Sequence, residues 1–93
     1  MGFEYDPVKN AGNIEKHGLP LDVAPLLFLG PFIEEEVIRP GLTEARFQAI
    51  GPIDRFGDRL FVVVYTWRDG RRRIISFRKA NEREARRYRR DHR

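Results

Sequence analysis

The chain has 93 residues, 41% of them hydrophobic and none a cysteine, which predicts one folded domain over residues 1–93 and excludes disulfides and thiolate metal sites. No stretch has the length and apolarity of a signal peptide or a membrane span, so we expect a cytoplasmic protein without a membrane partner. Residues 1–67 carry six basic and ten acidic side chains, and residues 68–93 carry twelve basic and four acidic ones. Such a basic segment favours a polyanion such as nucleic acid, with an acidic protein partner or a solvated helix as alternatives.

The first thirty residues predict a short strand and two helices. Residues 3–5 form the strand, and Asp6-Pro7 then has the residue types that cap and begin a helix, which Gly18 ends. We expect this helix to bury three apolar residues that share one face, Val8, Ala11 and Ile14. A second helix is expected over residues 22–28, with Asp22 as its cap, Gly30-Pro31 at its end and a buried face formed by Leu26, Leu27 and Phe28.

The rest of the chain predicts four strands and a final helix. The strands are expected over residues 32–39, 46–50, 60–67 and 73–78. The helix starts at Asn81, which has the spacing of a capping box with Glu84. The order β-α-α-β-β-β-β-α predicts an α+β domain, in which two N-terminal helices and one C-terminal helix pack on an antiparallel sheet.

Asp69-Gly70 predicts a two-residue hairpin turn. The register would then place Trp67 opposite Arg72 and Val63 opposite Ser76, and opposed residues share a face. One face would collect Phe61, Val63, Tyr65, Trp67, Arg72, Ile74, Ser76 and Arg78. The other face, the expected core face, would collect Val62, Val64, Thr66, Arg73, Ile75 and Phe77.

The first of these faces mixes aromatic rings with cations and a hydroxyl. Rings that stack on bases, beside arginines that bind phosphate, are what recognition of single-stranded RNA requires. The alternative is structural, with Arg72 packed on Trp67 in an ordinary second core layer.

The chain offers few conventional catalytic groups. His17 could act as a general base or acid, although a histidine near a helix end is often structural, and His92 is assigned no role. Two histidines and the run Glu34-Glu35-Glu36 do not favour a metal site, and no glycine-rich phosphate loop indicates a cofactor. Arginines can, however, promote attack of an RNA 2′-OH on the adjacent phosphate by stabilising charge in the transition state.

Six segments, in order along nearly the whole chain, resemble the BrnT toxins of BrnT/BrnA toxin–antitoxin modules. They are FEYDPxK at residues 3–9, NxxKHG at 13–18, ExRFxxIG at 44–51, VVYTxR at 63–68, RIISxRKA at 73–80 and ExxxY at 84–88. The residues around the second helix, Leu19-Pro20-Leu21 and Pro25, depart from the family pattern.

The resemblance implies a RelE-like fold and a metal-independent, cofactor-free endoribonuclease that inhibits translation. It also implies that a BrnA-like antitoxin neutralises the toxin. In the complex of the two proteins, only the antitoxin would bind operator DNA. The expected catalytic residues are Arg68, Ser76 and Arg78, together with His17. The expected RNA-binding residues are Lys16, Tyr65, Trp67, Arg72, Arg73 and Lys79. A basic module that binds nucleic acid without cutting it is the alternative.

Overall fold

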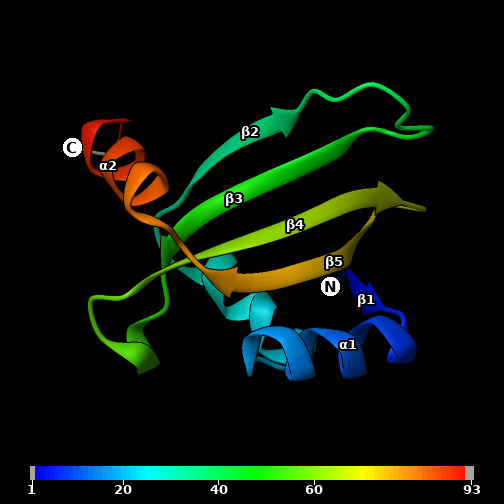
Figure 1. The fold of residues 1–93 in the computed structure, drawn as a ribbon, viewed down its shortest axis with the longest axis horizontal. Helices are drawn as coiled ribbons and strands as arrows, with labels where there is room; N and C mark the ends of the chain where they lie inside the picture. Colours follow the sequence, from blue (N-terminus) through cyan, green and yellow to red (C-terminus); the bar gives the residue numbers. More distant parts are fainter. Residues whose placement is uncertain (1, 92–93) are drawn as a thin grey trace.

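The computed structural model describes residues 2–91, and a five-stranded sheet is its central element (Figure 1). The elements are β1 (Phe3–Tyr5), α1 (Pro7–His17), the 3₁₀-helix η1 (Leu21–Leu29), β2 (Ile33–Val37), β3 (Arg46–Pro52), the short 3₁₀-helix η2 (Asp54–Phe56), β4 (Leu60–Arg68), β5 (Arg71–Lys79) and α2 (Glu82–Asp91). The predicted α+β class and the predicted order of the main elements are confirmed. The turn η2 was not predicted.

The strands lie side by side in the order β1-β5-β4-β3-β2. The four strands from β2 to β5 pair antiparallel, as predicted. The short β1 joins the outer edge of β5 in parallel, with Phe3 opposite Arg72 and Tyr5 opposite Ile74. The sheet is therefore mixed at that edge, and the wholly antiparallel prediction is wrong there. Within residues 2–91, no helix is long and apolar enough to span a bilayer.

Helix α1 begins and ends where the sequence predicts. The Asp6 side chain accepts a hydrogen bond of 2.8 Å from the Val8 N–H, and Gly18 ends the helix in the left-handed conformation at φ 72°. The predicted buried face is wrong, since Val8 is 78% exposed and Ile14 is also exposed. The helix is instead anchored by a polar residue on another face.

That anchor is Asn13, which is buried against β5. Its amide nitrogen donates to the carbonyl oxygens of Leu19 (2.7 Å) and Phe77 (2.8 Å), and its amide oxygen accepts from the Phe77 N–H (3.1 Å). Phe77 lies beyond the part of β5 that pairs with β1, and one side chain thus satisfies both its N–H and its carbonyl oxygen.

The second helix is a 3₁₀-helix that starts one residue before the prediction. Its N-cap is Pro20, so the predicted Asp22 cap is wrong. Pro25 lies inside it and has no N–H to donate to the preceding turn, so a regular α-helical hydrogen-bond ladder is interrupted there. The buried residues are Leu21, Ala24 and Leu27, so of the predicted set only Leu27 is fully buried.

The β4–β5 hairpin has the predicted turn but not the whole predicted register. Asp69 and Gly70 have φ angles of 54° and 76°, as a tight hairpin turn requires. The pairs from Arg68–Arg71 to Tyr65–Ile74 are as predicted, but an irregularity between Val64 and Tyr65 leaves Ile75 unpaired on β5. Such a β-bulge shifts all later pairs by one residue. Ser76 therefore lies opposite Val64, and the predicted pairing with Val63 is wrong.

The main core lies on the opposite side of β4 from the one that the sequence analysis predicted, and the bulge brings Phe77 onto that same side. One face, here called the covered face, packs on η1 and contributes Phe61, Val63, Tyr65, Ile74 and Phe77 to the larger core cluster. The predicted core face, which left out Tyr65 and Ile74, is therefore wrong. The opposite face packs on α2 at one end only, where Tyr88 contacts a smaller cluster that includes Ile50, Leu60 and Val62.

The rest of this second face is here called the open face. The strand pairings place on it side chains of four strands, namely Glu35 and Val37 of β2, Arg46 and Gln48 of β3, Val64, Thr66 and Arg68 of β4, and Arg71, Arg73, Ser76 and Arg78 of β5. Figure 1 views the sheet from this side, with α2 in front of one end of the strands.

Candidate active site

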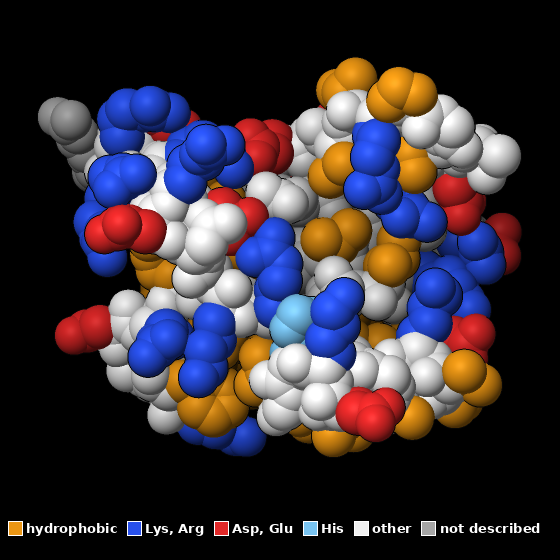
Figure 2. Space-filling view, in the orientation of Figure 1, with side chains coloured by type: hydrophobic (Ala, Val, Ile, Leu, Met, Phe, Trp, Pro, Cys, Tyr) orange, Lys and Arg blue, Asp and Glu red, His pale blue; other side chains and the backbone are white. Residues whose placement is uncertain are grey.

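The open face is bordered by basic side chains. Figure 2, in the same orientation, shows Lys and Arg side chains around a floor of hydrophobic and neutral side chains. A partly apolar floor with cations at its rim suits a nucleotide, because bases pack on apolar surface and phosphates bind cations. We therefore describe this face as the candidate site.

Arg78, on β5, is the most constrained cation of the open face. Its two Nη atoms each lie 2.8 Å from one carboxylate oxygen of Glu84, and Nη1 also donates to the Lys79 carbonyl oxygen at 3.3 Å. The hydrogen bond to Glu84 raises the pKa of Arg78 above its ordinary value and lowers the pKa of Glu84 below its own. Both groups are therefore ionised at neutral pH.

These contacts use one edge of the planar guanidinium. A guanidinium has five N–H donors in a fixed fork. Among residues 2–91, no recorded hydrogen bond uses the Nε–H or the second Nη2–H of Arg78. The free edge retains the two parallel donors that bind a phosphate group in bidentate fashion.

Glu84 is itself fixed by the start of α2. Its N–H donates to the Asn81 side-chain oxygen at 2.8 Å, and its carboxylate accepts from the Asn81 N–H at 2.9 Å. This reciprocal pair is the predicted capping box, which is confirmed. Glu84 is only 7% exposed, so the position of Arg78 depends directly on the first turn of the C-terminal helix.

His17 lies at the end of α1, within the electrostatic influence of Arg78. Loss of hydration, followed by the charges of Lys16 and Arg78, lowers the pKa of His17 below its ordinary value. The imidazole is therefore neutral at pH 7 and can accept a proton. Residue 92, the other histidine of the sequence, lies outside the described residues.

Arg73 and Ser76 share the open face with Arg78. Arg73 pairs with Glu4 of β1, with Nη1 3.0 Å from the carboxylate. Ser76 lies two residues before Arg78 on the same strand, about 7 Å along it. The structure thus brings together Ser76 and Arg78 of the predicted catalytic set, with Arg73 on the same face and His17 close enough to feel the charge of Arg78.

Arg68 lies at the other end of the sheet. It pairs with Glu44, 2.8 Å away, beside the β4–β5 turn. Its strand partner Arg71 precedes Arg78 by seven residues, which corresponds to about 20 Å along the strand. Arg68 is therefore not part of the cluster around Arg78.

Four of the predicted RNA-binding residues project from the covered face, namely Tyr65, Trp67, Arg72 and Lys79. The Tyr65 side chain is fully buried. The guanidinium carbon of Arg72 lies 4.0 Å from the ring centre of Phe28 and 4.6 Å from that of Trp67. The structural alternative for Arg72, cation–π packing on Trp67, is therefore confirmed.

Sequence reasoning did not assign Arg46, Gln48, Glu35 and Arg87 to the site. Glu35 lies on the open face, on β2, where its carboxylate contacts Arg87 of α2 at 2.7 Å and Gln48 at 3.2 Å. Strand alternation from the half-buried Phe47 would have indicated Arg46 and Gln48. Within the described part of the chain, no group of three or more His, Asp and Glu side chains is placed to bind a metal ion.

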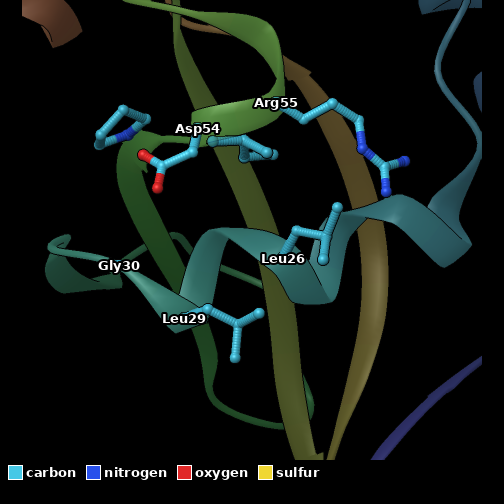
Figure 3. A pocket seen from close by; sticks show the side chains of 7 residues that line it. Leu26, Leu29, Gly30, Asp54 and Arg55 are labelled. Carbon is cyan, nitrogen blue, oxygen red and sulfur yellow. The ribbon is translucent and has the colours of Figure 1, made fainter.

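A pocket of about 240 Å³ lies apart from the open face, between the end of η1 and the segment from β3 to η2 (Figure 3). Leu26 and Leu29 line it, together with Gly30, and Asp54 and Arg55 lie at its edge. It contains a single acidic and a single basic side chain, so its lining offers less to a polyanion than the open face does.

A sequence model of one protein family matches residues 5–84 of the chain; the family is described as the ribonuclease toxin BrnT of type II toxin–antitoxin systems. A search of curated proteins found no match. The matched segment includes the open face and the Arg78–Glu84 pair and ends inside α2.

Proposed function

The chain belongs to the BrnT family of ribonuclease toxins of type II toxin–antitoxin systems, and we propose that it cleaves RNA on the open face without a metal ion. The observation that carries this proposal is the guanidinium of Arg78. Glu84 holds one of its edges, and the other edge keeps free donors on a surface bordered by cations.

The reaction we propose is attack of an RNA 2′-OH on the neighbouring phosphorus atom. The bond from O2′ to phosphorus forms and the bond from phosphorus to O5′ breaks, which leaves a 2′,3′-cyclic phosphate and a 5′-hydroxyl end. The 2′-OH proton passes to neutral His17, and O5′ takes a proton from the resulting imidazolium or from water. Arg78 stabilises the negative charge on the non-bridging oxygens.

The other residues of the open face act as binding groups in this proposal. The Ser76 hydroxyl donates to a phosphate oxygen, and Lys16 and Arg73 bind the flanking phosphates. Arg68, at the far end of the sheet, contacts a more distant part of the strand rather than the scissile phosphate. Tyr65, Trp67, Arg72 and Lys79 project from the covered face and are assigned no contact there.

A toxin of this family acts with an antitoxin, and we propose that a BrnA-like antitoxin neutralises this chain by covering the open face. Operator DNA would then bind through the antitoxin alone. Cleavage of cytoplasmic RNA would account for inhibition of translation.

Purified protein incubated with RNA in EDTA tests the proposal. We expect cleavage products with 2′,3′-cyclic phosphate ends from the wild type and none from Arg78→Ala. Expression of the wild type alone should arrest growth, and the same substitution should relieve the arrest. Salt-dependent binding of RNA without any cleavage would instead support a non-catalytic binding module.

A further inference from the structure

Helix α2 presents a second basic surface, which faces away from the sheet. Five arginines border one hollow of about 560 Å³ on its outer side. They are Arg83, Arg86, Arg87, Arg89 and Arg90. The spacing of three and four residues places several of them on one side of the helix, and the basic groups over α2 are visible in Figure 2.

Apart from Arg87, the arginines of this outer surface are weakly paired or have no recorded ion pair among residues 2–91. Arg86 lies 3.6 Å from Glu82, and Arg90 lies 3.0 Å from Asp91, in pairs whose side chains are largely exposed. Exposed pairs of this kind are weak, so a phosphate group can displace them. Within residues 2–91, Arg83 and Arg89 have no recorded ion pair.

The surface adjoins the candidate active site. The first turn of α2 holds Arg78 through Glu84, and Arg87 of the same helix pairs with Glu35 at the border of the open face. An RNA strand that leaves the open face across α2 would therefore meet the outer arginines next.

Resting on the function proposed above, we propose that Arg83, Arg86, Arg89 and Arg90 bind the phosphate backbone of RNA several nucleotides away from the cleaved bond. The preferred substrate is then a long single strand rather than a short oligonucleotide. Each guanidinium fork fits a phosphate group, and no sequence preference arises from such contacts.

The composition of α2 favours RNA over an acidic protein as the occupant. Protein interfaces depend on buried aromatic or aliphatic anchors. Between residues 82 and 91 the larger apolar side chain is that of Tyr88, which is buried against the sheet, and Ala85 also packs inward. The outer surface therefore offers charge without an anchor for a protein partner.

The test compares two RNAs that share one cleavable step, a tetranucleotide and a 20-nucleotide strand. The variant Arg83→Gln, Arg86→Gln, Arg90→Gln is compared with a control that loses the same charge at exposed positions elsewhere, Lys9→Gln, Arg39→Gln, Arg55→Gln. We expect kcat/KM of the α2 variant to fall about tenfold or more on the 20-mer and less than twofold on the tetranucleotide. The control should change less than twofold on both.

The salt dependence supplies a second readout. Three lost phosphate contacts should reduce the slope of log K against log salt for the 20-mer by about 2, at roughly 0.7 per contact. Equal effects on both RNAs, or none on the 20-mer, would overturn the inference. So would displacement of the 20-mer by poly-glutamate as effectively as by unlabelled RNA, because the surface would then bind acidic chains in general.

A failure of the proposed catalysis can be distinguished from a failure of the inference about α2. If the wild type cleaves neither RNA, the proposed function fails. Binding of the 20-mer, measured by fluorescence anisotropy, then decides the inference: weaker binding by the α2 variant than by the control supports it, and equal binding overturns it.

Discussion

The arginines around the open face and those on the outer side of α2 differ in what holds them. Arg73, Arg78 and Arg87 each pair with a glutamate from a different element, and their side chains are only 27–28% exposed. Arg86 and Arg90 pair with neighbours on their own helix, and their side chains are 66% and 67% exposed.

The difference separates two uses of the same side chain. A guanidinium held between two elements keeps a fixed position, which catalysis needs because its donors must meet the charge that develops in the transition state. A guanidinium free in solvent adapts to a flexible backbone and contributes to binding. The chain therefore combines positioned and solvent-exposed arginines on adjoining surfaces.

The largest expected effect comes from removing the best-positioned arginine. Arg78→Ala should lower the single-turnover cleavage rate of the tetranucleotide by about 10²–10³, the loss typical of one transition-state donor. Because this change also leaves Glu84 without its partner, Arg78→Lys is measured beside it and should retain the charge and the fold but not the bidentate geometry. Arg89→Ala, on the outer surface, should change this rate less than threefold. If Arg78→Lys and Arg89→Ala lowered the cleavage rate by similar factors, the positioned and the exposed arginines would not differ in their contribution to catalysis.

The dependence of the cleavage rate on pH tests the role of His17. Its lowered pKa keeps it neutral above about pH 6.5, so the rate should rise with pH up to the folded-state pKa and then level off. Protonation at lower pH removes the base and should reduce the rate about tenfold per pH unit. His17→Gln should lower the plateau by about 10² and abolish the rise. A rise that persists in the variant would assign the base to another group.

Glu84→Gln tests whether the ion pair between Arg78 and Glu84 also stabilises the fold. Loss of the charge leaves Arg78 with a weaker partner, and we expect about 2 kcal/mol of lost unfolding free energy in urea, less than for a fully buried pair because Arg78 is partly exposed. The pKa of Glu84 is lowered in the folded state, so its contribution is present above about pH 4.5 and is lost as the pH falls below that. The variant should therefore show a weaker loss of stability in acid.

The smallest expected effect belongs to the matching pair on the outer helix. Glu82→Gln removes the partner of Arg86 in an exposed pair and should change the free energy of unfolding by less than about 0.5 kcal/mol. The same urea titration measures it. A loss as large as that of Glu84→Gln would mean that burial does not distinguish the two pairs.

Local chemistry determined much of this fold, and the sequence predicted those parts. The Asp6 cap, the Gly18 end, the Asp69-Gly70 turn and the capping box of Asn81 all depend on residues within a few positions of one another. These features can be recognised in the sequence, because local backbone conformation and short-range hydrogen bonds define them.

The site was harder to predict because it depends on contacts between distant segments. Arg78 was identified from its motif, but its face was assigned wrongly, since nothing in the run of residues 73–78 marks Ile75 as unpaired. Asn13 was missed for a similar reason: a polar residue within a helix gives no sign that the backbone of Phe77 will need it. Pairs such as Arg87 with Glu35 require the folded sheet.

The bulge at Ile75 reverses which alternate residues of strand β5 point to the core. Before it, Arg72 and Ile74 point to the core and Arg73 points outward; after it, Phe77 points to the core and Ser76 and Arg78 point outward. Regular pairing of Ile75, without the bulge, would turn Ser76 and Arg78 toward the core and Phe77 toward solvent, whereas deletion of Ile75 would leave all three on their present sides. The irregular pairing at Ile75, rather than the chemistry of its side chain, thus decides on which side of the sheet the proposed catalytic groups lie, and both Ile75→Val and deletion of Ile75 should keep these groups on the open face.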